Sequence, residues 1–144
     1  MYKGAERSTM TNFKNSTFLG GTCANSTWRE ELLQMLKPAA KENTFNPVVP
    51  DWTPECQAIE DQARAEARFV LFVLTKEMTG VFSVAEVVDC SNKAPERTIF
   101  CYLAEDFDGH MAKSLKATAK MVAGNGATVL GSLQEVADFL NEQY

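Results

Sequence analysis

Apolar residues along the chain fall into short runs that alternate with segments of helical spacing. Five runs have the length and the content of Val, Ile, Phe and Thr expected of β-strands, at 16–21, 44–49, 68–75, 97–104 and 127–131. The third run, RFVLFVLT, is continuously apolar, which is typical of a strand buried on both faces. It is therefore predicted to lie at the centre of a sheet.

Between these runs the spacing predicts helices that carry recognisable start and stop signals. Ser/Thr followed three residues later by Glu, the capping-box pattern, occurs at Thr27–Glu30, Ser83–Glu86 and Ser132–Glu135. A further helix is predicted from Thr53 as N-cap, followed by Pro54, to about residue 67. The segment 109–126 has a helical stripe and stops at Gly-Asn-Gly.

The alternation of strands and helices determines the expected architecture. Parallel neighbours need long crossovers, and right-handed crossovers place helices on both faces of a sheet. We therefore predict a single-domain, flavodoxin-like (Rossmann-like) α/β three-layer sandwich, whose five-stranded parallel sheet has the order 2-1-3-4-5. The 144 residues suit one domain, expected over 15–144 after a flexible leader at 1–14.

Composition and charge narrow the class of partner. Charged residues make up 23% and hydrophobic residues 45%, as in ordinary soluble proteins, and no run approaches the roughly 20 apolar residues that cross a bilayer. The net charge of −5 argues against binding to nucleic-acid backbones. A small-molecule ligand is expected, with neither membrane nor nucleic acid as partner. The polar N-terminus lacks the apolar core of a signal peptide, so a cytoplasmic location is predicted.

The cysteines and the single histidine offer no metal-binding pattern. Cys23, Cys56, Cys90 and Cys101 are widely spaced and include no CxxC pair, so we interpret them as reduced thiols and predict no metal site. Without a partner for a thiol nucleophile, cysteine catalysis is a poor interpretation. His110 stands at the start of a helix and is interpreted as a surface residue.

The predicted topology selects one region for function. In such sheets ligands bind outside the carboxyl ends of the strands, at the switch point between strands one and three. The candidate residues are therefore those of the first turn, the loop after strand two and the segment after strand three, namely Gly20, Gly21, Thr22, Asp51, Trp52, Gly80, Phe82, Ser83 and Glu86.

Each of these features has a structural alternative. The glycines allow a ligand to approach the backbone or simply form a tight turn, and neither GxGxxG nor GxxxxGK[ST] is present. Trp52 is either a hydrophobic staple or an aromatic wall for a planar ring. Glu86 is either a capping residue or a partly desolvated catalytic carboxylate. Glu60 and Asp61, taken alone, are expected on a solvated helix face.

Four segments together, TFLGGT, NPVVPDWTPE, MTGVFSVAEVVD and TIFCYL, resemble the nucleoside 2-deoxyribosyltransferase family and its relatives that hydrolyse deoxynucleoside monophosphates. The resemblance covers residues 16–115. It implies a flavodoxin-like fold and retaining chemistry at an anomeric carbon, with no metal or organic cofactor.

The resemblance also implies roles for particular side chains. A Glu placed like Glu86 attacks C1′ of the deoxyribose and forms a glycosyl ester. The second acid of the family falls on Glu60, beside Asp61, and would protonate the leaving base and deprotonate the incoming one. Family members complete each other's sites across a dimer with a side chain after the fourth strand, which indicates Lys113 or Ser114 here. The resemblance therefore implies a homodimer or a higher homo-oligomer with shared active sites.

Three positions differ from the family pattern. Phe18 stands where the nucleoside transferases commonly have a Tyr that positions the nucleophile. In the glycine turn, Thr22 can replace the Ser of the nucleotide hydrolases, but Ala24 replaces the Arg that binds the 5′-phosphate. Lys113 could supply the missing positive charge.

Three functions follow as hypotheses. The first is cleavage or transfer of the N-glycosidic bond of 2′-deoxynucleosides or their 5′-monophosphates. The second is a non-catalytic module that binds or senses a nucleotide derivative, favoured by Phe18 and Ala24. The third is a glycohydrolase acting on NAD-like ribosides.

Overall fold

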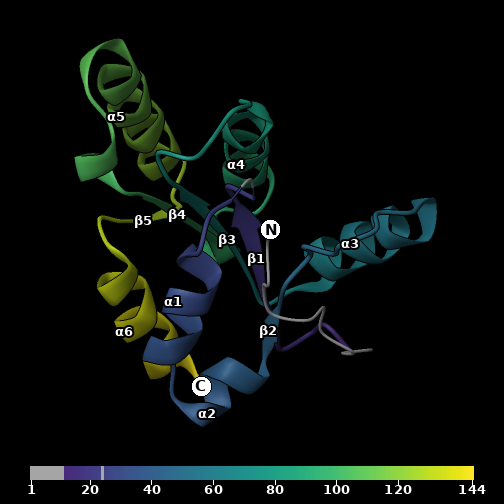
Figure 1. The fold of residues 1–144 in the computed structure, drawn as a ribbon. Helices are drawn as coiled ribbons and strands as arrows, with labels where there is room; N and C mark the ends of the chain where they lie inside the picture. The colour runs from purple at the N-terminus through teal and green to yellow at the C-terminus, as the bar shows by residue number, and fades with distance from the viewer. Residues whose placement is uncertain (1–11, 24) are drawn as a thin grey trace.

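The computed structural model describes residues 12–23 and 25–144 of the chain (Figure 1). Most of the predicted leader, 1–14, and the position of Ala24 lie outside the described residues. Phe13 lies within them and is buried, with its ring packed edge-on against Phe45 at a centroid distance of 5.4 Å. Packing onto the core therefore includes a residue that precedes the first strand.

The sheet has the predicted topology. Its five parallel strands, in the order β2-β1-β3-β4-β5, are β1 Thr17–Gly21, β2 Thr44–Phe45, β3 Phe69–Leu74, β4 Thr98–Tyr102 and β5 Thr128–Leu130. Every residue of β3 is buried, which confirms its central position. The reversal of strand order lies between β1 and β3.

In the described part of the chain, six α-helices cover the two faces of this sheet (Figure 1). Helices α1 Trp28–Met35, α2 Pro38–Glu42 and α6 Leu133–Gln143 lie on one face, and α3 Pro54–Glu66, α4 Phe82–Lys93 and α5 Gly109–Gly124 on the other. Short 3₁₀ turns, η1 Pro95–Arg97 and η2 Ala104–Asp106, flank β4. The predicted single-domain three-layer α/β sandwich is confirmed.

Alternation along β3 divides the core into two clusters. Phe69, Leu71 and Val73 pack against α1 and α6, whereas Val70, Phe72 and Leu74 face α3, α4 and α5. Successive side chains of a strand point to opposite faces, so a strand covered on both sides is apolar throughout. This explains the uninterrupted apolar run in the sequence.

Two predicted elements are shorter in the structure than in the sequence pattern. The strand expected at 44–49 ends after Phe45, because the side chain of Asn46 accepts a 3.0 Å bond from the amide of Val48 and turns the chain around Pro47. The first helix breaks at Pro38, which begins α2.

The helix ends give a mixed result. Thr53 and Ser132 accept bonds from the amides of Cys56 and Glu135, as predicted. The other two capping boxes are wrong. Neither Thr27 nor the residue before α4, Val81, makes a side-chain cap, and Ser83 lies inside α4 rather than before it.

The Gly-Asn-Gly stop after α5 is confirmed. Gly126, at φ +102°, donates to the carbonyl of Ala123, and Ala127 donates to that of Val122. These two bonds form a Schellman motif, which satisfies carbonyl groups that the end of the helix leaves open.

None of the helices in the described part of the chain is long and apolar enough to cross a membrane. Residues 12–23 and 25–144 also contain no group of three or more His, Cys, Asp or Glu side chains placed to hold a metal ion.

Candidate functional site

The turn after β1 lies against the carboxyl end of β3. Gly21 has φ +112°, and a Cβ atom added there would lie 2.1 Å from the carbonyl oxygen of Val73. A Cβ at Gly20 would lie 3.0 Å from the carbonyl oxygen of Leu71. The two glycines thus allow β1 and β3 to approach closely, which is a structural requirement whether or not a ligand binds.

Buried hydrogen bonds fix the shape of this turn. The hydroxyl of Thr22 accepts a 3.0 Å bond from the amide of Thr75, just after β3. The carbonyl of Thr22 accepts bonds of 2.8 Å from both the indole Nε1 of Trp28 and Nη1 of Arg29. Arg29 also donates through Nε and Nη2 to the carbonyl of Leu19. The side chains of the first residues of α1 therefore fix the conformation of the turn through hydrogen bonds to backbone carbonyls.

A cavity of about 260 Å³ opens above the turn, between it and the segment that leads into α4. Its lining contains Gly21, Thr22 and Cys23 from the turn, and Gly80, Phe82 and Ser83 from the segment after β3. The cavity lies at the carboxyl ends of β1 and β3, where an open α/β sheet binds its ligands. The site thus occupies the predicted switch point.

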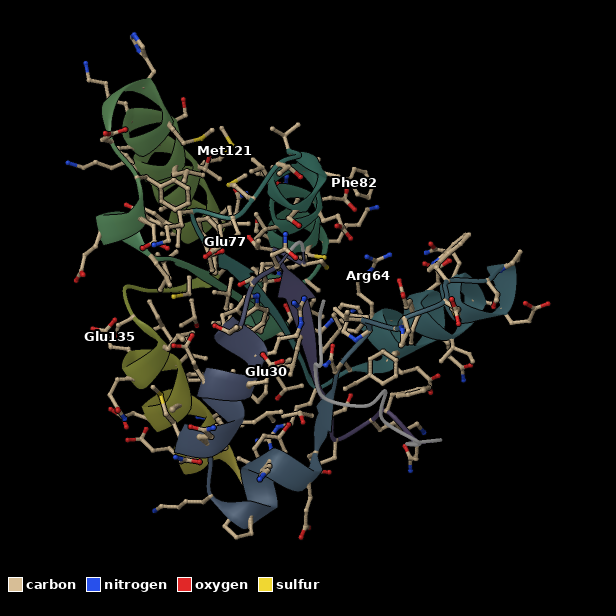
Figure 2. The ribbon with its side chains drawn as sticks, viewed as in Figure 1. Glu30, Arg64, Glu77, Phe82, Met121 and Glu135 are labelled. Atoms are coloured by element: carbon tan, nitrogen blue, oxygen red, sulfur yellow. The ribbon has the colours of Figure 1, made fainter. Side chains whose placement is uncertain are left out.

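Glu86 lies on α4 and forms an ion pair across to α3. One of its oxygens, Oε2, accepts a hydrogen bond from Nη1 of Arg64, whose Nη2 lies 3.2 Å from Oδ1 of Asp61. Figure 2 shows Arg64 in the space between the two helices. Glu86 is therefore bonded to a neighbouring helix and is not a capping residue.

The environment of Glu86 combines burial with charge. Its side chain is 22% exposed. Burial raises the pKa of this carboxyl, the guanidinium of Arg64 opposes that rise, and the negative charge of Asp61 adds to it. A carboxylate with a perturbed pKa beside a cleft is a common feature of catalytic sites.

A second cavity, of about 280 Å³, lies beside this ion pair. Its lining consists of Arg64, Phe82, Ala85, Glu86, Asp89 and Cys90. Phe82, which is 74% exposed, also lines the cavity over the glycine turn, so the two cavities share one wall. Glu86 thus faces open space next to the switch point.

Glu60 lies in a third cavity, of about 320 Å³, together with Trp52, Val48 and Cys23. Trp52 is 58% exposed, so its ring is available as one wall of this hollow. Cys23 lines this cavity and the one over the glycine turn. The two predicted catalytic carboxylates therefore face different cavities, each of which shares one lining residue with the cavity over the glycine turn.

The remaining predicted site residues lie outside these three cavities. Phe18 is buried, with its ring stacked on Phe45 at 5.7 Å. Asp51 is exposed in the loop before α3. Lys113 and Ser114 are exposed on α5, near its N-terminal end, as is His110.

A comparison with protein-family models gives one match. The model described as nucleoside 2-deoxyribosyltransferase like matches residues 14–107, more than half of the chain. The chain belongs to the nucleoside 2-deoxyribosyltransferase-like family. Comparisons with curated proteins and with solved structures found no match.

The family region contains the whole switch-point site. In this nucleoside 2-deoxyribosyltransferase-like chain, residues 14–107 include β1 to β4, the glycine turn, and both predicted carboxylates. Lys113 and Ser114 on α5 lie beyond it. The match supports nucleoside chemistry in general and leaves the substrate and the activity to be proposed.

Two arginines that the sequence analysis overlooked are central to this family member's site. Arg64 follows Glu60 by four residues and Asp61 by three, so all three lie along one side of α3. That spacing was a usable signal. Arg29 offered none, because an Arg inside WREELL is normally a surface residue, whereas here it is 1% exposed.

Proposed function

We propose that the protein cleaves or transfers the N-glycosidic bond of a 2′-deoxynucleoside or its 5′-monophosphate, with Glu86 as nucleophile. One observation carries the proposal: in a member of this family, a partly buried carboxylate at the carboxyl edge of the central strand is paired with Arg64 and faces a cavity. No metal or organic cofactor is needed for this chemistry.

In the first step, Oε1 of Glu86 attacks C1′ of the sugar and forms an ester. The bond between C1′ and the base nitrogen breaks, and its electron pair leaves with the base. Glu60, in its protonated form, gives the base a proton. The cavity of Trp52 and Glu60 supports this assignment, because an exposed indole offers a stacking surface for a planar base beside the acid.

In the second step, water or a second base attacks C1′ from the face that the first base has left. The attacking group loses a proton to the Glu60 carboxylate, and the electron pair of the ester bond returns to Glu86. Two inversions retain the configuration at C1′. Water as acceptor gives hydrolysis, and a base gives transfer.

A partner subunit is part of the proposal. Lys113 and Ser114 are exposed on α5 and line none of the three cavities, so within one chain they do not reach the site. In a homodimer with shared sites, Lys113 of one protomer would meet the 5′-phosphate in the other. Lys113→Ala is then expected to weaken binding of monophosphates more than binding of nucleosides.

The test incubates the purified protein with deoxynucleosides, deoxynucleoside monophosphates and NAD, with and without a second free base, and separates the products chromatographically. Glu86→Ala should lower base release by at least about a thousandfold, since the covalent route is lost. Asp89→Ala is the matched control, because Asp89 is a carboxylate on the next turn of α4 that lines the same cavity. Unchanged release by Glu86→Ala would contradict the assignment.

A non-catalytic sensor remains the second candidate. Phe18 and Ala24 favour it, because they replace the Tyr and the Arg that the family pattern places beside the nucleophile and the 5′-phosphate. Tight binding of a nucleotide with no product in any incubation would support the sensor. Cleavage of NAD with no action on deoxynucleosides would support the riboside glycohydrolase.

A further inference from the structure

The guanidinium group of Arg64 is held on several sides. Nη1 donates to Glu86, Nη2 lies 3.2 Å from Asp61, and the central carbon lies 5.9 Å from the centre of the Phe18 ring. Arg64 thus joins α3, α4 and β1 at the edge of the Glu86 cavity. The Lys93–Asp89 pair, by contrast, joins two exposed side chains of the same helix, α4.

The backbone of Arg64 is anchored as well. Nη1 of Arg97, in the turn before β4, donates to the carbonyl of Arg64 at 3.1 Å and to that of Ala67 at 2.7 Å. These bonds fix the C-terminal turn of α3 against the start of β4. The direction from which Arg64 approaches Glu86 is therefore determined by the fold and not by a mobile side chain alone.

We propose that Arg64 is the positioning residue for the nucleophile: it binds Oε2 of Glu86, restricts rotation of the carboxylate, and leaves Oε1 directed at C1′ of the sugar. This inference rests on the proposed function of Glu86. Phe18 contributes a ring and no hydroxyl, so the donor that fixes the carboxylate comes from α3 instead of β1.

The ion pair between Arg64 and Glu86 affects the charge of a partly buried carboxylate. Burial favours the neutral, non-nucleophilic carboxylic acid, and the positive charge of Arg64 counteracts this effect on the pKa of Glu86. Asp61 on α3 opposes Arg64. Asp89 and Cys90 on α4 line the same cavity, and Lys93 and Arg97 line the adjoining one.

The planar fork of an arginine does more than supply charge. It binds two groups at fixed angles, here Glu86 and Asp61, and so restricts rotation of the Glu86 carboxylate. A lysine would supply the positive charge without the planar guanidinium group that binds two partners at once. Substitution with Lys therefore separates the effect of charge from the effect of geometry.

The experiment measures kcat and KM against pH for the wild type, Arg64→Gln, Arg64→Lys and Lys93→Gln. We expect Arg64→Gln to lower kcat by about a hundredfold with KM within about threefold, because the reacting oxygen is misplaced. The acid limb of its profile of kcat against pH should move to higher pH, since the positive charge that lowers the pKa of Glu86 is gone. Arg64→Lys should keep the wild-type acid limb but recover kcat only in part.

Lys93→Gln is the matched control. It removes one positive charge from α4, two turns beyond Glu86, where Lys93 pairs with Asp89 at 2.9 Å on the surface. It should behave as the wild type. Far-ultraviolet circular dichroism and the midpoint of thermal unfolding establish that each variant is folded, and Arg64→Lys covers the case in which Arg64→Gln does not fold.

The outcomes separate the two proposals. If the wild type is active and Glu86→Ala is not, but Arg64→Gln matches Lys93→Gln, the inference about Arg64 is wrong and the proposed function stands. A faster Arg64→Gln would likewise overturn the inference, because Arg64 would then restrain the nucleophile. If the wild type releases no base, or Glu86→Ala is as active as the wild type, the proposed function itself fails.

Discussion

Arg29 and Arg64 lie on opposite faces of the sheet and have different surroundings. Arg29, on α1, is 1% exposed, stands 4.4 Å from the centre of the Trp28 ring, and donates to the backbone carbonyls of Leu19 and Thr22. Arg64, on α3, has a side chain that is 30% exposed and donates to two carboxylates beside a cavity.

This difference separates a structural role from a chemical one. Backbone carbonyls cannot move or titrate, so Arg29 fixes the course of the chain after β1. The carboxylate of Glu86 has access to open space and can change its charge, so the role that we propose for Arg64 concerns reactivity and brings little benefit to stability. On this proposal, the α1 side of the switch point is a rigid structural support, and the α4 side carries the nucleophile.

The largest expected effect is on the Arg29 side. Arg29→Leu should lower the free energy of unfolding by about 3–5 kcal/mol, because buried hydrogen bonds from a charged group are lost and the Leu19 carbonyl loses its side-chain donors. Urea unfolding followed by circular dichroism measures this. Arg64→Leu should cost about 1 kcal/mol or less in the same assay. Equal losses for the two variants would remove the distinction between them.

The glycine turn gives the next largest effect. Gly21→Ala should lower the free energy of unfolding by about 2–4 kcal/mol, because φ is +112° and the new Cβ would meet the backbone of Val73.

Gly80→Ala is the matched control for the opposite side of the same cavity. A Cβ at Gly80 has no atom within 4 Å, so its stability should stay within about 0.5 kcal/mol of the wild type. A Gly80→Ala variant as unstable as Gly21→Ala would mean that the segment before α4 is as constrained as the glycine turn.

Features that depend on many residues could be predicted from the sequence better than features that depend on one. The strand order, the central position of β3 and the location of the cavity follow from periodicity and general rules of chain topology, which depend on many residues at once. The break of the first helix at Pro38 and the short β2 depend on one residue each and were underestimated.

The site was less accessible from the sequence, because its contacts join residues far apart in the chain. The capping-box spelling at Ser83–Glu86 is real as a pattern, yet the helix begins at Phe82 and Glu86 turns to Arg64, 22 residues earlier. The Glu86 carboxylate can bond either to a backbone amide at the start of its own helix or to the guanidinium of Arg64. The spacing of residues within one segment does not indicate which of the two it binds. Whether Glu60 acts with Glu86 stays a prediction, because the two carboxylates line different cavities that have no residue in common.

The smallest expected effect concerns stability at Glu86 itself. Its pKa in the folded state is raised above the ordinary value, chiefly by burial, so folding favours the protonated form. The stability that this group contributes is therefore present at acidic pH and is lost as pH rises through its folded pKa. Glu86→Gln has no such loss, so the difference between its midpoint of thermal unfolding and that of the wild type should rise in favour of the variant between pH 4 and pH 8.

Asp89→Asn provides the control, since Asp89 has a side chain that is 59% exposed and pairs with Lys93 on the surface. It should show no comparable gain with rising pH, because exposed pairs contribute little and are screened by salt. A catalytic carboxylate is expected to be kept at a cost in stability. If Glu86→Gln instead loses stability as pH rises, the ion pair with Arg64 outweighs burial, and Glu86 is a structural residue like those around Arg29.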